Sequence, residues 1–149
     1  MRVFFYGLFM DEGLLEGQGI SPAEVSPAFV DGFGLRIGER ATLVRHPDYR
    51  AYGVLMDITP DEANTLYAEE SVVDYEPEPV IVTLIDGTQV EAICYNLPED
   101  KIAGFNPAYA KALLDLATRL EIPAVYLNQI RQAQQPLHLR LQGLCLEEN

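Results

Sequence analysis

The sequence is poor in basic residues. Ten Lys and Arg side chains face 23 Asp and Glu, which gives a formal net charge of −13 at pH 7. A surface of this sign repels both the phosphates of nucleic acids and anionic lipid headgroups. We therefore expect neither a nucleic-acid partner nor a membrane partner.

Long apolar runs are also missing. Nothing approaches the roughly 20 apolar residues of a membrane-spanning helix. The apolar stretch after Arg2 is short, Asp11 and Glu12 follow it at once and no small-x-small cleavage site is present, so we expect a buried strand and not a signal peptide. Cys94 and Cys145 lie far apart between apolar residues, which predicts reduced core thiols in a cytoplasmic protein.

Signatures of metals and cofactors are absent from the sequence. His46 and His138 are isolated, with no ligand spacing around them. No G-x-G-x-x-G or P-loop pattern follows the first predicted strand. The sequence predicts no metal site and no cofactor.

The length of 149 residues predicts one domain over residues 1–149, large enough to bury about two-thirds of its unfolded surface. Strands are expected at residues 2–10, 29–37, 51–58, 80–85, 88–95 and 137–141, with a possible short one at 43–44. Asp86-Gly87 is a strong hairpin signal between two of them. Helices are expected from Thr59, from Asn106 and from Pro123. Strands that precede the main helices, without regular alternation, favour an α+β fold: a curled sheet or small β-barrel with helices packed against it.

One carboxylate falls on the apolar side of a predicted helix. Thr59-Pro60-Asp61-Glu62 has the form of a capping box with proline at the first helical position. If the helix continues to residue 71, Glu70 shares a face with Ala63 and Leu66, whereas Glu69 lies on the solvent side. Because a buried glutamate tends to have a raised pKa, Glu70 is a candidate proton-transfer group.

The end of the first strand is the second candidate feature. Tyr6-Gly7-Leu8-Phe9 places a glycine where the chain would turn, and glycine permits backbone angles that aim the following amides into a cleft. Packing in the strand is the alternative explanation for such a Tyr-Gly pair.

Four segments match a known family in order and spacing. They are Tyr6 to Phe9, Tyr52 to Leu55, Leu66 to Ser71, and the stretch from Asn106-Pro107 to Tyr126. On these motifs the chain resembles the γ-glutamylcyclotransferase-like (AIG2-like) family. The resemblance implies that family's small mixed fold.

The resemblance also implies a reaction. In that family a γ-glutamyl group is cyclised to 5-oxoproline with release of an amine, one glutamate acts as general acid/base, and the matching position here is Glu70. Such a residue takes a proton from the attacking amine and returns one to the leaving nitrogen. Backbone N–H groups around Gly7, Leu8 and Phe9 would receive the charge on the carbonyl oxygen. Tyr6 and Tyr95 are expected to line the pocket, the partner being a small γ-glutamyl-type substrate.

The sequence departs from the family pattern at several positions. Leu8 stands where serine or threonine is usual, Tyr67 where aspartate is common, and Glu76 follows Tyr75 in a stretch that lacks the common arginine. One of four clustered arginines could instead hold a substrate carboxylate: Arg36, Arg40, Arg45 and Arg50. Tyr75 and Tyr109 could serve either packing or substrate contact. Two alternatives to the cyclotransferase stay open: a non-catalytic module that binds a small molecule or a protein, and a related amide-cleaving or acyl-transferring enzyme.

Overall fold

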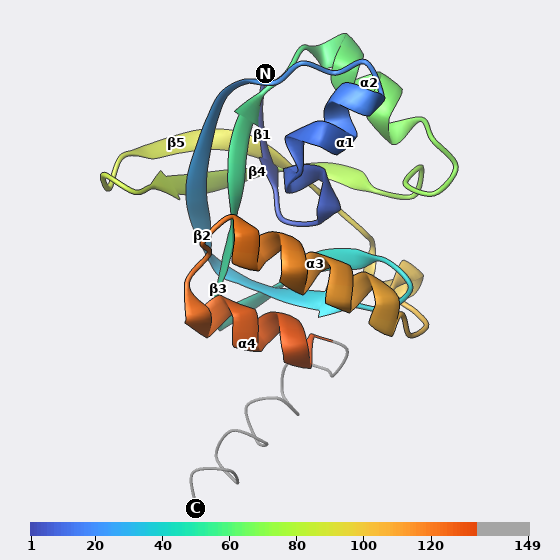
Figure 1. Cartoon of the computed structure of the whole chain (residues 1–149), viewed down its shortest axis with the longest axis vertical. Coiled ribbons are helices and arrows are strands. Elements are labelled where there is room, and N and C mark those ends of the chain that lie inside the picture. The colour runs from blue at the N-terminus through green and yellow to red at the C-terminus, as the bar shows by residue number, and fades with distance from the viewer. Residues whose placement is uncertain (134–149) are drawn as a thin grey trace, which may run out of the picture.

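A computed structural model of the chain describes residues 1–133 and shows a closed five-stranded β-barrel with helices packed on its outside (Figure 1). The strand order around the barrel is β1-β3-β2-β4-β5. The strands are β1 (Arg2–Phe5), β2 (Ala23–Ile37), β3 (Ala41–Asp57), β4 (Glu76–Leu84) and β5 (Gln89–Asn96). The helices are α1 (Glu12–Gly17), α2 (Pro60–Tyr67), α3 (Pro107–Arg119) and α4 (Ala124–Gln132). The predicted α+β class with a small barrel is confirmed. The predicted strand at residues 137–141, together with His138 and Cys145, lies outside the described residues.

The first strand is shorter than expected. β1 ends at Phe5, and residues 8–10 form a 3-10 turn (η1, Leu8–Met10) instead of continuing the strand. β1 pairs antiparallel with β3 and, through Val3 and Ile93, parallel with β5. The strand that precedes the Tyr-Gly motif therefore closes the barrel, and the motif itself lies where the chain leaves that strand.

β2 and β3 form one long hairpin. The two strands predicted at residues 43–44 and 51–58 are parts of the single strand β3, which pairs with β2 along most of its length. The pairing register shifts between Asp31 and Phe33, and Gly32 there has a φ of +82°, a backbone conformation that favours glycine. Such a bulge bends the strands and lets a long hairpin curl into a barrel.

The hairpin predicted at Asp86-Gly87 is present between β4 and β5. Gly87 has a φ of +87°, and Asp86 Oδ1 accepts a hydrogen bond from Thr88 N at 2.9 Å. Aspartate stabilises the turn through this bond, and glycine supplies the positive φ that other residues rarely adopt.

α2 begins as predicted and ends earlier than predicted. Thr59 Oγ1 accepts a hydrogen bond from Glu62 N at 3.0 Å, and Glu62 Oε1 accepts one from Thr59 N at 2.9 Å, so the capping box is complete. The helix stops at Tyr67, and residues 68–74 form turns and a bend. Glu70 therefore has no place on a helical face, and the expectation that it lies on one was wrong.

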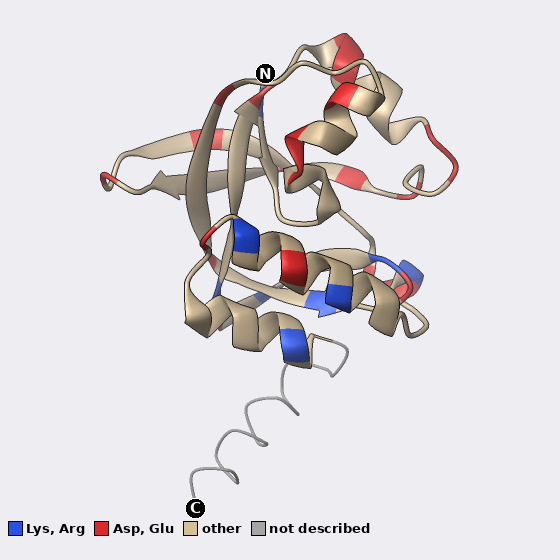
Figure 2. Cartoon of the chain, in the orientation of Figure 1, with Lys and Arg blue, Asp and Glu red and all other residues tan. Residues whose placement is uncertain are grey.

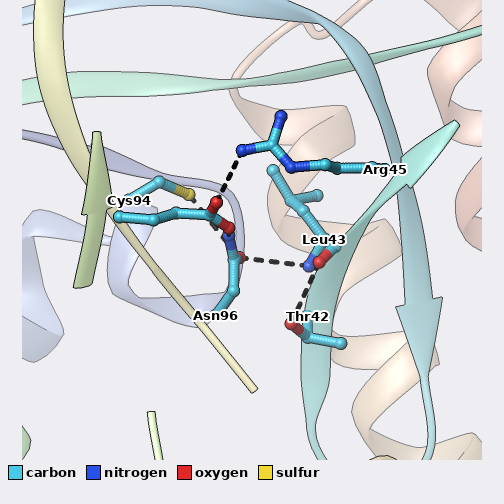
Figure 3. Close-up of polar contacts among 6 residues, drawn as sticks. Thr42, Leu43, Arg45, Cys94 and Asn96 are labelled. Carbon is cyan, nitrogen blue, oxygen red and sulfur yellow. Dashed lines mark hydrogen bonds and ion pairs between the residues drawn. The ribbon is translucent and has the colours of Figure 1, made fainter. Parts of the chain in front are cut away.

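A polar cluster in which Thr42 and Asn96 are buried joins β3, β4 and β5 (Figure 3). Asn96 on β5 donates from Nδ2 to Glu78 Oε1 and accepts at Oδ1 from Leu43 N at 3.3 Å. Thr42 Oγ1 accepts from Leu97 N at 2.9 Å, and Arg45 Nη2 lies 2.9 Å from Glu78 Oε2. Since buried polar groups are costly when unpaired, these bonds fix the position of β5 against β3.

No helix within residues 1–133 is long and apolar enough to cross a membrane. The same residues contain no cluster of three or more His, Cys, Asp or Glu side chains suited to a metal ion. Cys94 is buried and unpaired, and burial raises the pKa of its thiol.

Candidate functional site

A cavity of about 300 Å³ opens beside the turn that follows β1. Eight of its sixteen lining residues are aromatic, and we call it the tyrosine cavity. Its lining comes from β1 and the turn after it, α1, the turn before β3 with the first residue of β3, the end of α2 with the segment behind it, β5 and α3. The lining residues are Phe4, Phe5, Tyr6, Gly7, Leu8, Phe9, Leu14, Glu39, Arg40, Ala41, Tyr67, Ser71, Val72, Tyr75, Tyr95 and Tyr109.

Rings in mutual contact form one side of the cavity. Phe9 meets Tyr67 edge to face, with ring centroids 6.0 Å apart, and Tyr67 stacks on Tyr95 with centroids 3.8 Å apart and planes 13° apart. Tyr75 packs against the other side of the group, 6.1 Å from Tyr67. Burial raises the pKa of Tyr67 well above its usual value, so its hydroxyl is neutral at physiological pH. This side of the cavity offers a ligand an aromatic, uncharged surface.

The turn that contains Tyr6 and Gly7 contacts α3 through the hydroxyl group of Tyr109. Leu8 N donates a hydrogen bond to the Tyr109 hydroxyl oxygen at 3.3 Å. A β-carbon on Gly7 would lie 2.7 Å from that same oxygen, which is closer than real β-carbons come to other atoms. Gly7 has a φ of −108°, an angle open to every residue. Glycine therefore leaves room for the close approach of Tyr109, and the expectation that it supplies unusual backbone angles was wrong.

Tyr6 anchors the start of the same turn to β5 through a hydrogen bond. Its hydroxyl donates to Tyr95 O at 2.7 Å, and the side chain is buried. Burial raises its pKa well above the usual tyrosine value. Tyr6 is thus a fixed structural element that joins the end of β1 to β5.

The charged part of the lining lies on the turn between β2 and β3. Glu39 N donates to Ala103 O at 2.8 Å and Glu39 O accepts from Asn106 Nδ2 at 3.1 Å, which hold the turn against the segment before α3. Arg40 Nη1 lies 3.2 Å from Asp74 Oδ2 and 3.4 Å from Ser71 O. Within residues 1–133, Glu39 is the one carboxylate and Arg40 the one cation that line the tyrosine cavity.

Glu70 is placed differently from the sequence-based expectation. It lies in the turns after α2, is exposed like its neighbour Glu69, and does not line the cavity. The next two residues, Ser71 and Val72, do line it. The premise that singled out Glu70, a carboxylate buried on an apolar helical face, does not hold in this structure.

A second cavity, of about 350 Å³, lies beside the polar cluster of Figure 3. Its charged lining residues are Arg45, Glu76, Glu78 and Glu99. Arg45 pairs with Glu78, and the buried Asn96 is bonded on both sides of its amide. Arg45, the one cation among these lining residues, is thus engaged by Glu78, and no aromatic ring from residues 1–133 lines this cavity, so the tyrosine cavity is the stronger candidate for a binding site.

All five residues that the sequence proposed for substrate binding line one cavity: Tyr6, Gly7, Leu8, Phe9 and Tyr95. The sequence also named Tyr75 and Tyr109 without deciding between packing and contact, and Arg40 as one of four arginines that could hold a substrate carboxylate; all three line the cavity. Tyr67 and Glu39 were not foreseen as lining residues. Tyr67 gave a signal, because it stands where the related pattern has aspartate, whereas nothing in the sequence marked Glu39.

Comparison with known proteins gives one family match. A family model described as the AIG2-like family matches residues 50–130, a stretch that runs from the middle of β3 into α4. A search of curated protein sequences found no match.

Solved structures share this fold at low sequence identity. A γ-glutamyl cyclotransferase structure superposes with a TM-score of 0.69 and 17% identity, over 87% of this chain and 85% of that one. An uncharacterized human protein gives a TM-score of 0.70 and 20% identity over the same shares of the two chains. YkqA from Bacillus subtilis gives a TM-score of 0.72 and 21% identity over 90% of this chain and 54% of its own. These likenesses establish the γ-glutamylcyclotransferase-like fold.

Proposed function

Because the chain belongs to the AIG2-like family and its cavity is lined mainly by aromatic side chains, we propose that it binds a small molecule with an apolar or aromatic body, without turning it over. One observation carries the proposal: the tyrosine cavity has the volume and the mainly apolar lining, with few polar groups, of small-molecule sites.

The contacts inside the cavity favour binding over turnover. Acyl chemistry at this turn would need free N–H donors for the developing oxyanion. The Leu8 N–H is already bonded to the Tyr109 hydroxyl, so a substrate oxygen would have to displace it. A general base must also reach the reacting amine, and Glu70, to which the family resemblance assigned this role, is exposed and outside the lining. Glu39 is the one carboxylate within residues 1–133 that lines the cavity, and the family resemblance gives it no role.

Cyclisation of a γ-glutamyl amide to 5-oxoproline, with Glu70 as general acid/base, is the second candidate. The observation that favours it is the position of Glu70 directly before Ser71 and Val72, which line the cavity. Attack within one substrate molecule forms a five-membered ring and needs no cofactor, so correct positioning would supply much of the rate. The closing of the turns at residues 68–74 over a bound substrate would bring this carboxylate to the cavity.

A single set of variants separates the two candidates. Leu8→Trp places a bulky side chain in the cavity lining, and Ile85→Trp, at a hairpin residue that is 81% exposed, is its matched control. Both variants add a fluorophore to a chain that has no tryptophan. Calorimetry with 3-phenyl-1-propanol, indole and γ-glutamyl-phenylalanine measures binding, and chromatography of the same mixtures measures 5-oxoproline.

We expect binding of at least one of these compounds by the wild type and by Ile85→Trp, loss of binding in Leu8→Trp, and no 5-oxoproline. Release of 5-oxoproline that is lost in Glu70→Gln and kept in Glu69→Gln would replace the binding proposal with the second candidate. No heat of binding for any compound would contradict both.

A further inference from the structure

We infer that the ligand of the tyrosine cavity carries a carboxylate, and that Arg40 is the residue that selects for it by exchanging its contact with Asp74 for the ligand. This inference rests on the proposed function, since it assumes that the cavity is occupied by a small molecule. It adds the chemical class of the polar group that accompanies the apolar body.

Two of the three guanidinium nitrogens of Arg40 are available to a ligand. Both of its protein contacts use one nitrogen, Nη1, which faces Asp74 Oδ2 and Ser71 O. Within residues 1–133, its Nε and Nη2 have no hydrogen-bond partner, and its side chain is 27% exposed. Guanidinium groups bind carboxylates through two parallel N–H bonds, a geometry that this single-nitrogen contact leaves unused.

The contact with Asp74 is one that a ligand can replace. The distance is 3.2 Å, the Asp74 side chain is 40% exposed, and both partners therefore stay partly hydrated. Exposed single-contact ion pairs contribute little, whereas a bidentate carboxylate in a partly enclosed cavity is held more strongly. Asp74 then acts as a placeholder that keeps the guanidinium at the cavity until a ligand arrives.

The negative charge of the protein makes Arg40 important for the binding of an anionic ligand. The formal net charge is −13, and acidic residues predominate around α1 and α2, whereas Lys and Arg lie mainly on the β2–β3 hairpin, α3 and α4 (Figure 2). An anionic ligand is repelled by this field and needs a local cation to bind. Arg40 is that cation, and its guanidinium lies 5.9 Å from the centre of the Tyr75 ring, so the charge adjoins the aromatic surface.

Glu39 distinguishes two sources of the carboxylate. It lines the same cavity, and within residues 1–133 its carboxylate forms no ion pair. A simple carboxylic acid would be repelled by Glu39, whereas an amino acid could place its ammonium group there. The carboxylate contact with Arg40 is common to both ligands.

The test uses two comparisons: 3-phenylpropionate and 3-phenylpropanamide differ only in the carboxylate, and L-phenylalanine adds an ammonium group to 3-phenylpropionate. Calorimetry measures 3-phenylpropionate, L-phenylalanine and 3-phenylpropanamide with the wild type, Arg40→Gln, Asp74→Asn and Glu39→Gln. Arg45→Gln, which removes an equal charge from an exposed pair outside this cavity, is the matched control. Asp74→Asn keeps the test valid if Arg40→Gln folds poorly, because it weakens the competitor and leaves the guanidinium in place.

We expect at least one of the two carboxylates to bind more tightly than the amide, by about tenfold or more, with this preference lost in Arg40→Gln and kept in Arg45→Gln. Asp74→Asn should tighten carboxylate binding severalfold and leave amide binding unchanged. If L-phenylalanine is the better ligand and Glu39→Gln removes its advantage, the carboxylate belongs to an amino acid; otherwise it belongs to a simple acid. Equal binding of acid and amide in the wild type, with no effect of Asp74→Asn, would overturn the inference while leaving the proposed function intact. No binding of any of the three would count against the proposed function itself.

Discussion

Replacing Gly7 by alanine should destabilise the protein because the added β-carbon collides with the hydroxyl oxygen of Tyr109. The new β-carbon would lie 2.7 Å from the Tyr109 hydroxyl oxygen, and no other non-neighbouring atom lies within 4 Å of it. The backbone at Gly7, with φ −108° and ψ −154°, is accessible to alanine. Overpacking of this kind costs about 1–3 kcal/mol, to which the displaced hydrogen bond from Leu8 N adds.

Tyr109→Phe removes the atom in question. On its own it should cost less than about 1 kcal/mol, because the Leu8 N–H bond is long at 3.3 Å and water in the cavity can replace the hydroxyl. In this background Gly7→Ala should cost little, since the obstructing oxygen is gone. The double-mutant cycle should therefore show a coupling free energy of about 1–2 kcal/mol between the two positions.

Urea unfolding followed by circular dichroism measures all four proteins of the cycle. Gly17→Ala, at a position with nothing within 4 Å of the added carbon, is the control and should not destabilise. Additive effects of Gly7→Ala and Tyr109→Phe would refute the reasoning. They would mean that the glycine is required by the backbone of the turn and not by the approach of Tyr109.

Two further predictions concern the scaffold. Thr59→Ala removes the hydroxyl that accepts a hydrogen bond from Glu62 N, and it should lower the free energy of unfolding by about 1 kcal/mol. Thr59→Ser keeps a hydroxyl and should retain most of that stability. Equal losses of stability for the two variants in a urea titration would contradict the role of the capping box. Burial raises the pKa of Tyr109 to about 12, against about 10 in the unfolded chain. The folded state therefore favours the neutral form of Tyr109, and the stability that depends on this form is fully present below pH 10. As the pH rises towards 12, the free energy of unfolding should fall by at most about 3 kcal/mol from this residue. Thermal unfolding between pH 9 and 12 should show this fall, reduced in Tyr109→Phe; an identical fall in that variant would contradict it.

The sequence predicted the parts of the fold that depend on local chemistry. The capping box at Thr59 and the Asp86-Gly87 hairpin are both present, because each is decided by a few adjacent residues. The order of strands and helices was sufficient to predict the α+β class and a small barrel. The length of β3 was missed because its polar middle, from Arg45 to Arg50, obscures a strand that β2 holds in place by pairing.

The candidate site was predictable in its position and less so in its chemistry. The Tyr-Gly turn and Tyr95 line the same cavity. The helix carrying Glu70 was extended too far, since periodicity alone gives no stop signal after Tyr67, and a carboxylate assigned to an apolar face is exposed. The contact of Tyr109 with Leu8 spans 101 residues, and no local pattern in the sequence could have shown it.

Nuclear magnetic resonance of the protein with bound 3-phenyl-1-propanol and 3-phenylpropionate tests the central claim most directly. The account predicts intermolecular nuclear Overhauser effects from the phenyl protons to the rings of Tyr67, Tyr75 and Tyr109, with a shift of the Leu8 amide resonance. Contacts confined to other surfaces, or no change in these resonances at millimolar ligand, would contradict the claim that the tyrosine cavity is a small-molecule binding site.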